Sequence, residues 1–283
     1  MMITEIKPRN LILTGVPRGG TTLTSFLLNQ LENVVALDEP MNVGKFTPND
    51  TDKNCSMIED FFAEQRQTLI LNGSAISQTV DGSPIDNPLS DKRDAITGQR
   101  IRRINSMALT VEKQLGVDFT LGLKHPAAFS AMLPVLHPRY ECYAAIRNPL
   151  AILLSWQNAH SAVFEGRAPA AERVQTSLTV LLDSVDDRYN RQIALLSWYF
   201  DQYEILPIGR VLKYEDIVQT DGNIIPLHFA VEGKVSVPLS SRNTHFIENI
   251  DVKMLADKLL SYNGAYMRYY TESDILALIS GAS

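Results

Sequence analysis

The stretch of residues 11–28 constrains the fold more strongly than any other part of the chain. It begins with a short apolar run, is broken by glycine and proline at residues 15–20, and then places apolar side chains at the spacing of a helix. A strand, a glycine-rich loop and a helix in this order direct backbone amides and the positive end of the helix dipole toward one point. The stretch therefore predicts an anion-binding loop.

The spacing of this loop is close to that of the P-loop, in which two glycines separated by four residues precede a lysine and then a serine or threonine. Gly15 and Gly20 fit this pattern, but Thr21 stands in place of the lysine and Thr22 follows it. The positive charge of the loop comes instead from Arg18. Such a loop suits a 5′-phosphate group but lacks the usual cation for the β- and γ-phosphates of ATP. An ordinary tight turn between strand and helix is the alternative.

The composition is that of a globular protein and limits its partners. The chain has 283 residues, of which 45% are hydrophobic and 20% are charged. The net charge of −6 argues against broad binding to nucleic acid or to anionic membranes, so an anion site must be local. Cys55 and Cys142 fit neither a disulfide framework nor zinc spacing. No apolar run has the length of a membrane span and residues 1–10 lack the plan of a signal peptide, so we expect a cytoplasmic protein.

Four further apolar segments indicate strands, and a charged residue ends or follows each of them. They are residues 33–37, 119–124, 140–147 and 209–213, with helical patterns between them. Strands that alternate with helices form a mainly parallel sheet covered on both faces. We therefore predict an α/β fold, a single domain over residues 1–283 with a mainly parallel sheet flanked by helices and a P-loop-like nucleotide-binding core.

Two carboxylates, Asp38 and Glu39, follow the second predicted strand, and Pro40 comes directly after them. An apolar strand followed by Asp-Glu resembles a Walker B segment, whose carboxylates hold magnesium. A carboxylate at the carboxyl end of a strand, beside an anion-binding loop, is also well placed to act as a general base. The third possibility is a carboxylate that only stabilises the turn before the proline.

The strand over residues 119–124 ends in Lys124, and His125 follows it. A lysine at the end of an apolar strand is costly to bury without a partner, so Lys124 is expected to meet an anion. That anion is either a carboxylate of the protein or a ligand. His125 is a second candidate base, and the alternative is a histidine that faces water where Pro126 stops the strand.

The strand over residues 140–147 ends in another cation, Arg147. Asn148 suits the N-cap of the next helix and Pro149 its first position. Ser155 lies seven residues after Asn148, on much the same face of that helix. We therefore expect Arg147 and Ser155 to bind one phosphate, and pairing of Arg147 with a carboxylate is the alternative.

Five segments resemble the motifs of the sulfotransferases that use 3′-phosphoadenosine 5′-phosphosulfate (PAPS), and they follow one another along the chain in the same order as in that family. Residues 16–23 are similar to the loop that binds the 5′-phosphosulfate, with Gly19 in place of the usual serine. The segment from Arg147 to Ser155 resembles the family's 3′-phosphate segment. The other three resembling segments are residues 39–40, 123–126 and 211–217. Together the five cover residues 10–217, whereas residues 218–283 match only loosely and form a C-terminal extension.

The resemblance implies transfer of a sulfuryl group from PAPS to an acceptor hydroxyl, which leaves adenosine 3′,5′-bisphosphate and requires no metal. It leaves the base open between Glu39 and His125, of which our mechanistic hypothesis uses Glu39, and it implies Arg18 and Lys124 as the cations at the transferring group. The residues that it implies for binding PAPS are Arg18, Gly19, Gly20, Thr21, Thr22, Arg147, Ser155 and Arg242.

The acceptor side is expected in residues 38–116. Residues 41–56 and 72–90 read as polar loops, and residues 91–116 read as a helix whose arginines contact an anionic acceptor or form a solvated face. These features favour a polar acceptor such as a glycan over a flat phenol, and other small molecules remain open. No nucleic-acid partner is expected.

Two other functions fit parts of the pattern. A P-loop kinase or NTPase would use Asp38 and Glu39 as its magnesium site, but it would lack the lysine that catalysis at the β- and γ-phosphates normally uses. A protein that binds a nucleotide without chemistry would tolerate neutralisation of both Glu39 and His125.

Overall fold

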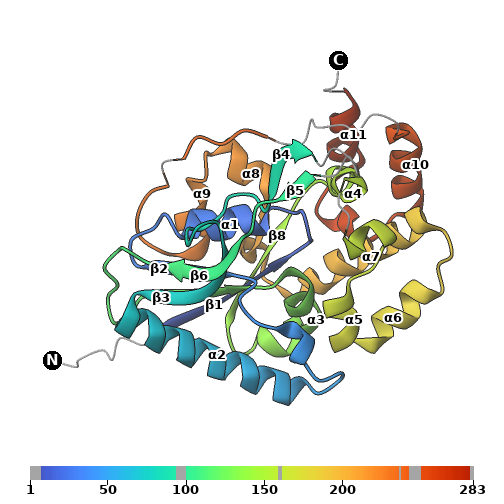
Figure 1. The fold of residues 1–283 in the computed structure, drawn as a ribbon. Coiled ribbons are helices and arrows are strands. Elements are labelled where there is room, and N and C mark those ends of the chain that lie inside the picture. The colour runs from blue at the N-terminus through green and yellow to red at the C-terminus, as the bar shows by residue number, and fades with distance from the viewer. Residues whose placement is uncertain (1–7, 94–99, 159–160, 236, 242–249, 281–283) are drawn as a thin grey trace.

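A five-stranded parallel sheet forms the centre of the protein (Figure 1). The computed structural model describes residues 8–93, 100–158, 161–235, 237–241 and 250–280. The strand order is β2-β7-β1-β8-β9, and each pair is parallel. The strands are β1 (Arg9–Gly15), β2 (Val34–Asp38), β7 (Thr120–Lys124), β8 (Glu141–Ile146) and β9 (Val211–Lys213). The predicted α/β class and mainly parallel sheet are confirmed.

The register of this sheet brings the predicted polar strand ends together. Asp38 at the end of β2 pairs with Lys124 at the end of β7, and Lys124 also pairs with Leu13 of β1. On the other side of β1, Gly15 pairs with Ala145 of β8. Carboxyl ends of parallel strands lie at one edge of a sheet, so the loops after β1, β2, β7 and β8 converge there.

Helices cover both faces of the sheet. They are α1 (Thr21–Leu28), α2 (Thr51–Asn72), α3 (Pro126–Leu136), α4 (Pro149–Gln157), α5 (Pro169–Val174), α6 (Thr176–Asp183), α7 (Arg188–Gln202), α8 (Tyr214–Gln219), α9 (Ile224–Phe229), α10 (Val252–Tyr262) and α11 (Glu272–Ser280). Short 3₁₀ turns include η1 (Val43–Lys45) and η2 (Ala162–Glu165). None of the described helices combines the length and apolar character that a membrane crossing requires.

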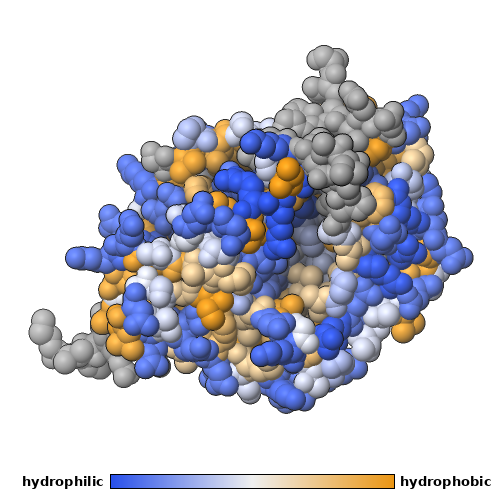
Figure 2. Space-filling model, viewed as in Figure 1, coloured by the Kyte–Doolittle hydropathy of each residue, from blue (hydrophilic) through white to orange (hydrophobic). Residues whose placement is uncertain are grey.

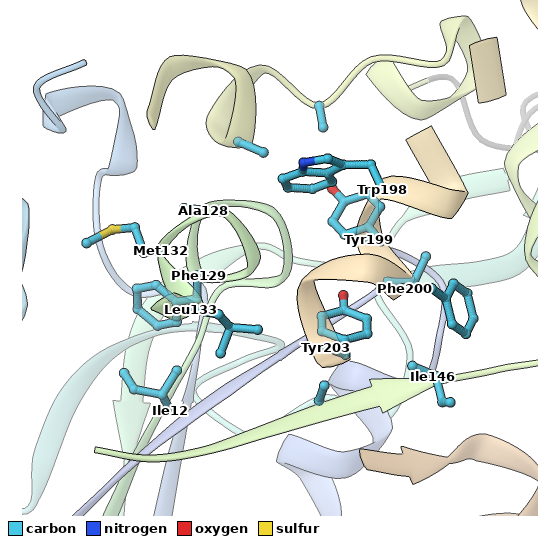
Figure 3. Packing of buried hydrophobic residues seen from close by; sticks show 14 of the residues in the cluster. Ile12, Ala128, Phe129, Met132, Leu133, Ile146, Trp198, Tyr199, Phe200 and Tyr203 are labelled. Atoms are coloured by element: carbon cyan, nitrogen blue, oxygen red, sulfur yellow. The ribbon is translucent and has the colours of Figure 1, made fainter. Parts of the chain in front are cut away.

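Alternating strand residues divide the core into two clusters, one on each face of the sheet. Ile12 of β1 belongs to the larger cluster with α2, α3, α4 and α7, whereas its neighbours Leu11 and Leu13 belong to the smaller cluster with α1, α8 and α9. This alternation follows from the period of two along a strand. Figure 3 shows part of the larger cluster, in which Phe129 and Leu133 of α3 face Tyr203, which follows α7.

The prediction of a helix over residues 91–116 is wrong. Two short antiparallel pairs include this segment: β4 (Leu89–Arg93) with β5 (Arg100–Arg102), and β6 (Ser106–Thr110) with β3 (Ser74–Thr79). β3 also corrects the expectation of an irregular segment over residues 72–90. In β3 the residues Ala75, Ser77 and Thr79 are buried on one face, which is strand periodicity on a mostly polar segment. Apolar patterning does not detect such a strand because its pairing partner supplies the stability.

The polar loop expected over residues 41–56 ends earlier than predicted. Helix α2 already begins at Thr51, because Asp50 caps it by accepting a hydrogen bond from the backbone amide of Lys53 at 3.1 Å.

Lys113 joins the segment after β6 to the first β-α-β unit. Its ammonium donates to the carbonyl oxygens of Asn29 at 3.0 Å and Leu31 at 2.7 Å, and also to that of Val34. Asn29 and Leu31 follow α1 and Val34 begins β2, so the ammonium holds the turn between this helix and this strand. Burial lowers the pKa of Lys113 to about 8, so the ammonium is still mainly charged at pH 7.

We expect Lys113→Met to lower the free energy of unfolding at pH 7 by about 1–3 kcal/mol, because three carbonyl acceptors lose a charged donor. Denaturant unfolding measures this, and Lys45→Met at an exposed lysine is the control. An unchanged stability would show that water replaces the ammonium at no cost.

Candidate functional site

The loop between β1 and α1 contains glycines where its backbone approaches other backbone closely. Gly15 has φ +143°, and a Cβ atom there would lie 2.2 Å from the carbonyl oxygen of Ala145. A Cβ atom on Gly19 would lie 2.8 Å from the carbonyl oxygen of Val16. The serine that the sulfotransferase motif has at this position therefore does not fit the loop without a backbone shift.

The N-terminus of α1 faces the space above the loop. Gly20 is the N-cap residue and contributes no side chain, and the first turn contains no acidic residue. The first amides of a helix have no partner within the helix, and the helix dipole adds positive charge to them. This end of α1 therefore has the properties of an anion site, and anion binding there stays a prediction.

Arg18 is held in position by α4. It adopts a left-handed backbone conformation with φ 71°, which is strained for a residue with a side chain. Its Nε donates to Oγ of Ser155 at 3.1 Å. One residue further along α4, Nε1 of Trp156 donates to the carbonyl oxygen of Pro17 at 2.9 Å. Two side chains of α4 therefore fix the loop that carries Arg18.

Arg147 follows β8 and lies beside the same loop. Its Nη1 is 3.4 Å from the carbonyl oxygen of Arg18, and its guanidinium lies over the ring of Tyr214 at 4.5 Å from the ring centroid. Glu215 accepts a hydrogen bond at 3.0 Å from the backbone amide of Asn148, which fixes the turn that carries Arg147. The structure thus places Arg18 in contact with both Ser155 and Arg147. Binding of one phosphate by Arg147 and Ser155 stays a prediction.

Lys124 joins the two carboxylates that follow β2. Its side chain is 2% exposed, and its Nζ is 2.7 Å from Oδ1 of Asp38 and 3.0 Å from Oε1 of Glu39. The third contact of Nζ is a hydrogen bond of 3.1 Å to Oγ1 of Thr22 in the first turn of α1. The cation that the loop lacks at Thr21 is therefore supplied from the neighbouring strand β7.

These three charged groups shift each other's pKa values. Burial acts to raise the pKa of Glu39, but the charge of Lys124 outweighs it, so the pKa is lowered. Burial raises the pKa of Asp38 in spite of Lys124, and the charge of Glu39 adds to the rise. Burial acts to lower the pKa of Lys124, but both carboxylates raise it. We conclude that Lys124 is a permanent cation and that Glu39 is ionised.

Glu39 is the more accessible of the two carboxylates. Its side chain is 39% exposed, against 8% for that of Asp38. Glu39 also has a left-handed backbone, with φ 42°. Such strain concentrates at functional sites because the surrounding structure has to maintain it. Of the two, Glu39 is the carboxylate that a ligand can reach.

His125 is buried, and one of its ring nitrogens is engaged. Its Nε2 accepts a hydrogen bond of 3.0 Å from the backbone amide of Met41, which places the ring proton of the neutral form on Nδ1. Burial lowers the pKa of His125 to about 4. The lone pair of Nε2 is therefore not available to a substrate in this arrangement, which favours Glu39 over His125 as the base.

A cavity of about 650 Å³ connects these groups. Figure 2 shows the hollow near the centre of the face in view, with hydrophilic side chains beside it. Most of the residues singled out from the sequence line it. They are Arg18, Gly20, Thr21, Thr22, Glu39, Lys124, His125, Arg147 and Ser155. Gly19 lies in the loop beneath, and Arg242 lies outside the described residues.

The cavity has two apolar ends, and each belongs to a different core cluster. Leu23 and Phe26 of α1 line one end together with Val237 and Leu239, and these residues pack on the smaller cluster. Small and apolar residues of α3, α4, η2 and the start of α5 line the other end, on the side of the larger cluster. The cations and Glu39 lie between the two ends, at the edge of the sheet.

Sequence reasoning missed three residues of this site. Tyr214 lies in a segment that was singled out, but nothing in the sequence indicated that its ring supports Arg147. Trp156 follows Ser155 directly, yet its contact with Pro17 depends on the packing of α4. Tyr199 lines the cavity from α7 and carries no local signal.

Comparison with known proteins finds distant likenesses of structure only. No family model and no curated protein matches the sequence. The structure is similar to sulfotransferases of known structure. Sulfotransferase STF9 from Mycobacterium avium is 14% identical, with 93% of this chain and 77% of that chain covered and a TM-score of 0.41. The sulfotransferase domain of the Synechococcus PCC 7002 olefin synthase is 16% identical, with 97% and 94% covered and a TM-score of 0.41.

A third structure, sulfotransferase STF1 from Mycobacterium tuberculosis H37Rv, is 14% identical, with 90% of this chain and 77% of that chain covered and a TM-score of 0.38. Such distant likenesses carry no argument about chemistry, which has to come from the side chains of this site.

We expect the burial of neutral His125 to make stability pH-dependent. Its pKa is 6.5 when unfolded and about 4 when folded, so the unfolded chain takes up this proton first as the pH falls. The group therefore removes about 3 kcal/mol of stability between pH 7 and pH 4. Denaturant unfolding across this range should show a smaller loss for His125→Gln than for wild type, and His228→Gln is the control. Equal losses in wild type and His125→Gln would mean that His125 is not held neutral.

Proposed function

We propose that this protein transfers a sulfuryl group from PAPS to an acceptor hydroxyl. One observation carries the proposal: Arg18, Arg147 and Lys124, from three different strand ends, lie on one cavity beside an uncapped helix N-terminus and an accessible carboxylate. A substrate with two separate anionic groups, a nucleoside and a transferable group at one end matches this arrangement. The resemblance of the sequence motifs to those of PAPS-dependent sulfotransferases supports the same conclusion.

The cavity divides into places for the parts of such a donor. Arg18 and the first amides of α1 suit the 5′-phosphosulfate, because they combine a guanidinium with backbone donors. Arg147, with Ser155 near the same loop, suits the 3′-phosphate. The apolar end with Phe26 and Leu239 suits the adenine ring.

Lys124 and Glu39 lie where the chemistry would take place. The acceptor oxygen forms a bond to sulfur while the bond from sulfur to the bridging oxygen of the 5′-phosphate breaks. Negative charge develops on that bridging oxygen, where fixed cations such as Lys124 and Arg18 stabilise the transition state. Glu39 accepts the proton of the acceptor hydroxyl, and the other product is adenosine 3′,5′-bisphosphate.

The low pKa of Glu39 bears on this role. A carboxylate held ionised by Lys124 is always ready to accept a proton, but it is a weak base. An anionic donor bound beside Lys124 adds negative charge near Glu39 and offsets the positive charge of the ammonium, so donor binding should raise the pKa of Glu39. Glu39 would then become a stronger base only when the donor is in place.

The position of Lys124 argues against a P-loop kinase or NTPase. Asp38 and Glu39 would form the magnesium site, but the ammonium of Lys124 lies between their oxygens at 2.7 and 3.0 Å. A dication at that point would have to displace a buried cation from its partners, which is costly.

The acceptor is proposed here only as a molecule with a hydroxyl group. The sequence favoured a glycan because residues 41–56, 72–90 and 91–116 were expected to form polar loops and a basic helix. Among the described residues, 51–56 belong to α2, and 74–79, 89–93, 100–102 and 106–110 form β3 to β6, so the basic helix on which that argument relied is not there and the polar loops are shorter than expected.

The first test is a thermal-shift titration with adenosine 3′,5′-bisphosphate, adenosine 5′-phosphate and magnesium ATP. We expect a shift with the bisphosphate that exceeds the shift with the monophosphate. A ligand present at 100 times its Kd adds about 2.7 kcal/mol of stability, which is readily measured. A shift with magnesium ATP alone would contradict the proposal and support a kinase.

We expect Arg147→Ala to weaken binding of the bisphosphate by about 10- to 100-fold, because it removes charge-assisted hydrogen bonds to the 3′-phosphate. Binding of adenosine 5′-phosphate should change little, and Arg139→Ala at an exposed arginine is the matched control. Isothermal titration calorimetry measures both ligands. Equal losses for the two nucleotides would place Arg147 somewhere other than the 3′-phosphate.

We expect Glu39→Gln to lower kcat by about 100-fold or more with labelled PAPS, because a glutamine cannot accept the proton. The Kd of the bisphosphate should not rise, since the substitution removes a negative charge near Lys124. Glu32→Gln, at an exposed glutamate before β2, is the control. Turnover at the wild-type rate would show that Glu39 is not the base.

A further inference from the structure

The C-terminal segment of the described chain packs on the turn that carries Arg147. Its elements are η5 (Ala265–Arg268) and α11 (Glu272–Ser280), with Tyr270 between them. Helix α11 packs against α4, the helix that begins directly after this turn (Figure 1). Tyr270 and Ile275 of this segment belong to the larger core cluster and are 4% and 0% exposed. The sulfotransferase motifs end before the segment, so they assign it no role.

Tyr270 reaches the turn through Glu215, the second residue of α8. The Oη of Tyr270 donates to Oε2 of Glu215 at 2.8 Å, and Oε1 of Glu215 accepts from the backbone amide of Asn148 at 3.0 Å. Burial and then the charge of Glu215 raise the pKa of Tyr270 well above its usual value, so the phenol stays protonated and keeps its role as donor. One carboxylate thus joins the C-terminal segment to the residue that follows Arg147.

A second contact joins the same turn to the start of α11. The side-chain amide of Asn148 donates to the carbonyl oxygen of Asp274 at 2.7 Å. The Oδ1 of Asn148 caps α4, because it accepts from the backbone amides of Leu150 and Ala151. One side chain therefore bridges the N-terminus of α4 and the first turn of α11.

The first turn of α11 is itself fixed by a reciprocal pair of hydrogen bonds. The backbone amide of Thr271 donates to Oδ2 of Asp274 at 2.8 Å, and the backbone amide of Asp274 donates to Oγ1 of Thr271 at 3.2 Å. This arrangement is that of a capping box, which holds the entry to a helix in one conformation. The carbonyl oxygen that Asn148 uses is therefore presented by a well-defined helix terminus.

The start of α8 carries this support to both neighbours of Arg147. Glu215 follows Tyr214 directly, and the ring of Tyr214 lies under the guanidinium of Arg147. The hydrogen bond from Tyr270 to Glu215 therefore holds the ring that stacks on Arg147 as well as the turn at Asn148. A guanidinium held in this way loses less freedom when an anion binds it.

We propose that Tyr270 and Asp274 are positioning residues for Arg147, so that docking of the C-terminal segment and binding of a nucleotide 3′-phosphate strengthen each other. The inference rests on the proposed function, in which Arg147 binds that phosphate. The docked segment orients the guanidinium before the phosphate arrives, and the bound phosphate in turn holds the turn on which the segment packs. Coupling between two binding events is reciprocal, so each favours the other by the same factor.

The reciprocal effect is tested on the wild-type protein. Hydrogen exchange of the backbone amides of α11 is measured in the free protein, with saturating adenosine 3′,5′-bisphosphate and with saturating adenosine 5′-phosphate. We expect the bisphosphate to slow this exchange by about fivefold or more and the monophosphate to leave it unchanged. Equal protection by the two bound nucleotides, or none by either, would overturn the proposal.

Tyr270→Phe removes the hydroxyl that holds Glu215. The Kd of the bisphosphate should rise about three- to tenfold, the value of one hydrogen bond, while the Kd of adenosine 5′-phosphate changes little. Calorimetry measures both ligands. In the free variant the backbone amide of Asn148, followed by NMR, should exchange faster than in wild type. An unchanged ratio of the two Kd values would contradict the role of Tyr270.

Tyr266→Phe is the matched control. Tyr266 lies in the same segment and is 0% exposed, but its Oη donates to the carbonyl oxygen of Leu259 in α10. This variant should lower the Tm and leave the ratio of the two Kd values as in wild type. A change of the ratio as large as that in Tyr270→Phe would show that any loosening of the segment has this effect, and the specific role of Tyr270 would be wrong.

Thr271→Val supplies a second variant, at an exposed residue. It removes the side-chain half of the capping box, which loosens the carbonyl of Asp274 that Asn148 uses. The Kd of the bisphosphate should rise about two- to threefold, with little change for adenosine 5′-phosphate. Equal changes for the two nucleotides would contradict the role of Asp274.

The proposed donor and the role of the C-terminal segment can fail separately. If the bisphosphate binds wild type and Tyr270→Phe leaves the ratio of the Kd values unchanged, the donor stands and this inference is wrong. If the bisphosphate does not bind wild type, the proposed donor is wrong. Faster exchange of the Asn148 amide in Tyr270→Phe would then still support the positioning of the turn, and unchanged exchange would overturn it.

Discussion

The buried ion pairs of Lys124 hold the site together. This one ammonium connects β7 to the end of β2 through Asp38 and Glu39, and to the first turn of α1 through Thr22. Taking these charges out of water is expensive, and removing one partner from such a group is more costly still. The arrangement of the strand ends, the conformation of Glu39 and the position of α1 therefore depend on each other. Apolar replacement of a whole buried ion pair is often neutral in proteins, so we infer that this group contributes geometry rather than net stability.

The central sheet could be predicted from the sequence because its strands are buried on both faces. Such strands appear as short apolar runs, and glycine, proline or a charged residue marks where each run ends. The segment between α2 and β7 could not be predicted for the opposite reason. Its strands are half exposed and polar, and β3 depends on a partner, β6, that lies about thirty residues further along. A run of arginines at positions 100, 102 and 103 fits a helix or a strand equally well when that partner is unknown.

The contrast between buried strands and segments that depend on distant partners also explains which parts of the candidate site could be predicted. Arg18, Lys124 and Arg147 follow strands, and strand ends of a parallel sheet meet at one edge, so their convergence follows from the fold class alone. Tyr214, Trp156 and Tyr199 reach the site from helices. Which face a helix turns toward the cavity depends on packing across the sheet, and no local pattern reports it.

The two ends of the cavity rest on opposite faces of the sheet. This separates the residues that would select the nucleotide from those that would select the acceptor. The end beside α1 packs on the smaller core cluster, and the end beside α3, α5 and α7 packs on the larger one. Substitutions in distant, independently packed regions have nearly additive effects. The end that would hold the acceptor can therefore change in size and polarity while the loop, α1 and Arg147 stay as they are. Lys124 and Glu39 lie between the two ends, so under the proposed function they would couple the nucleotide on one side to proton removal on the other.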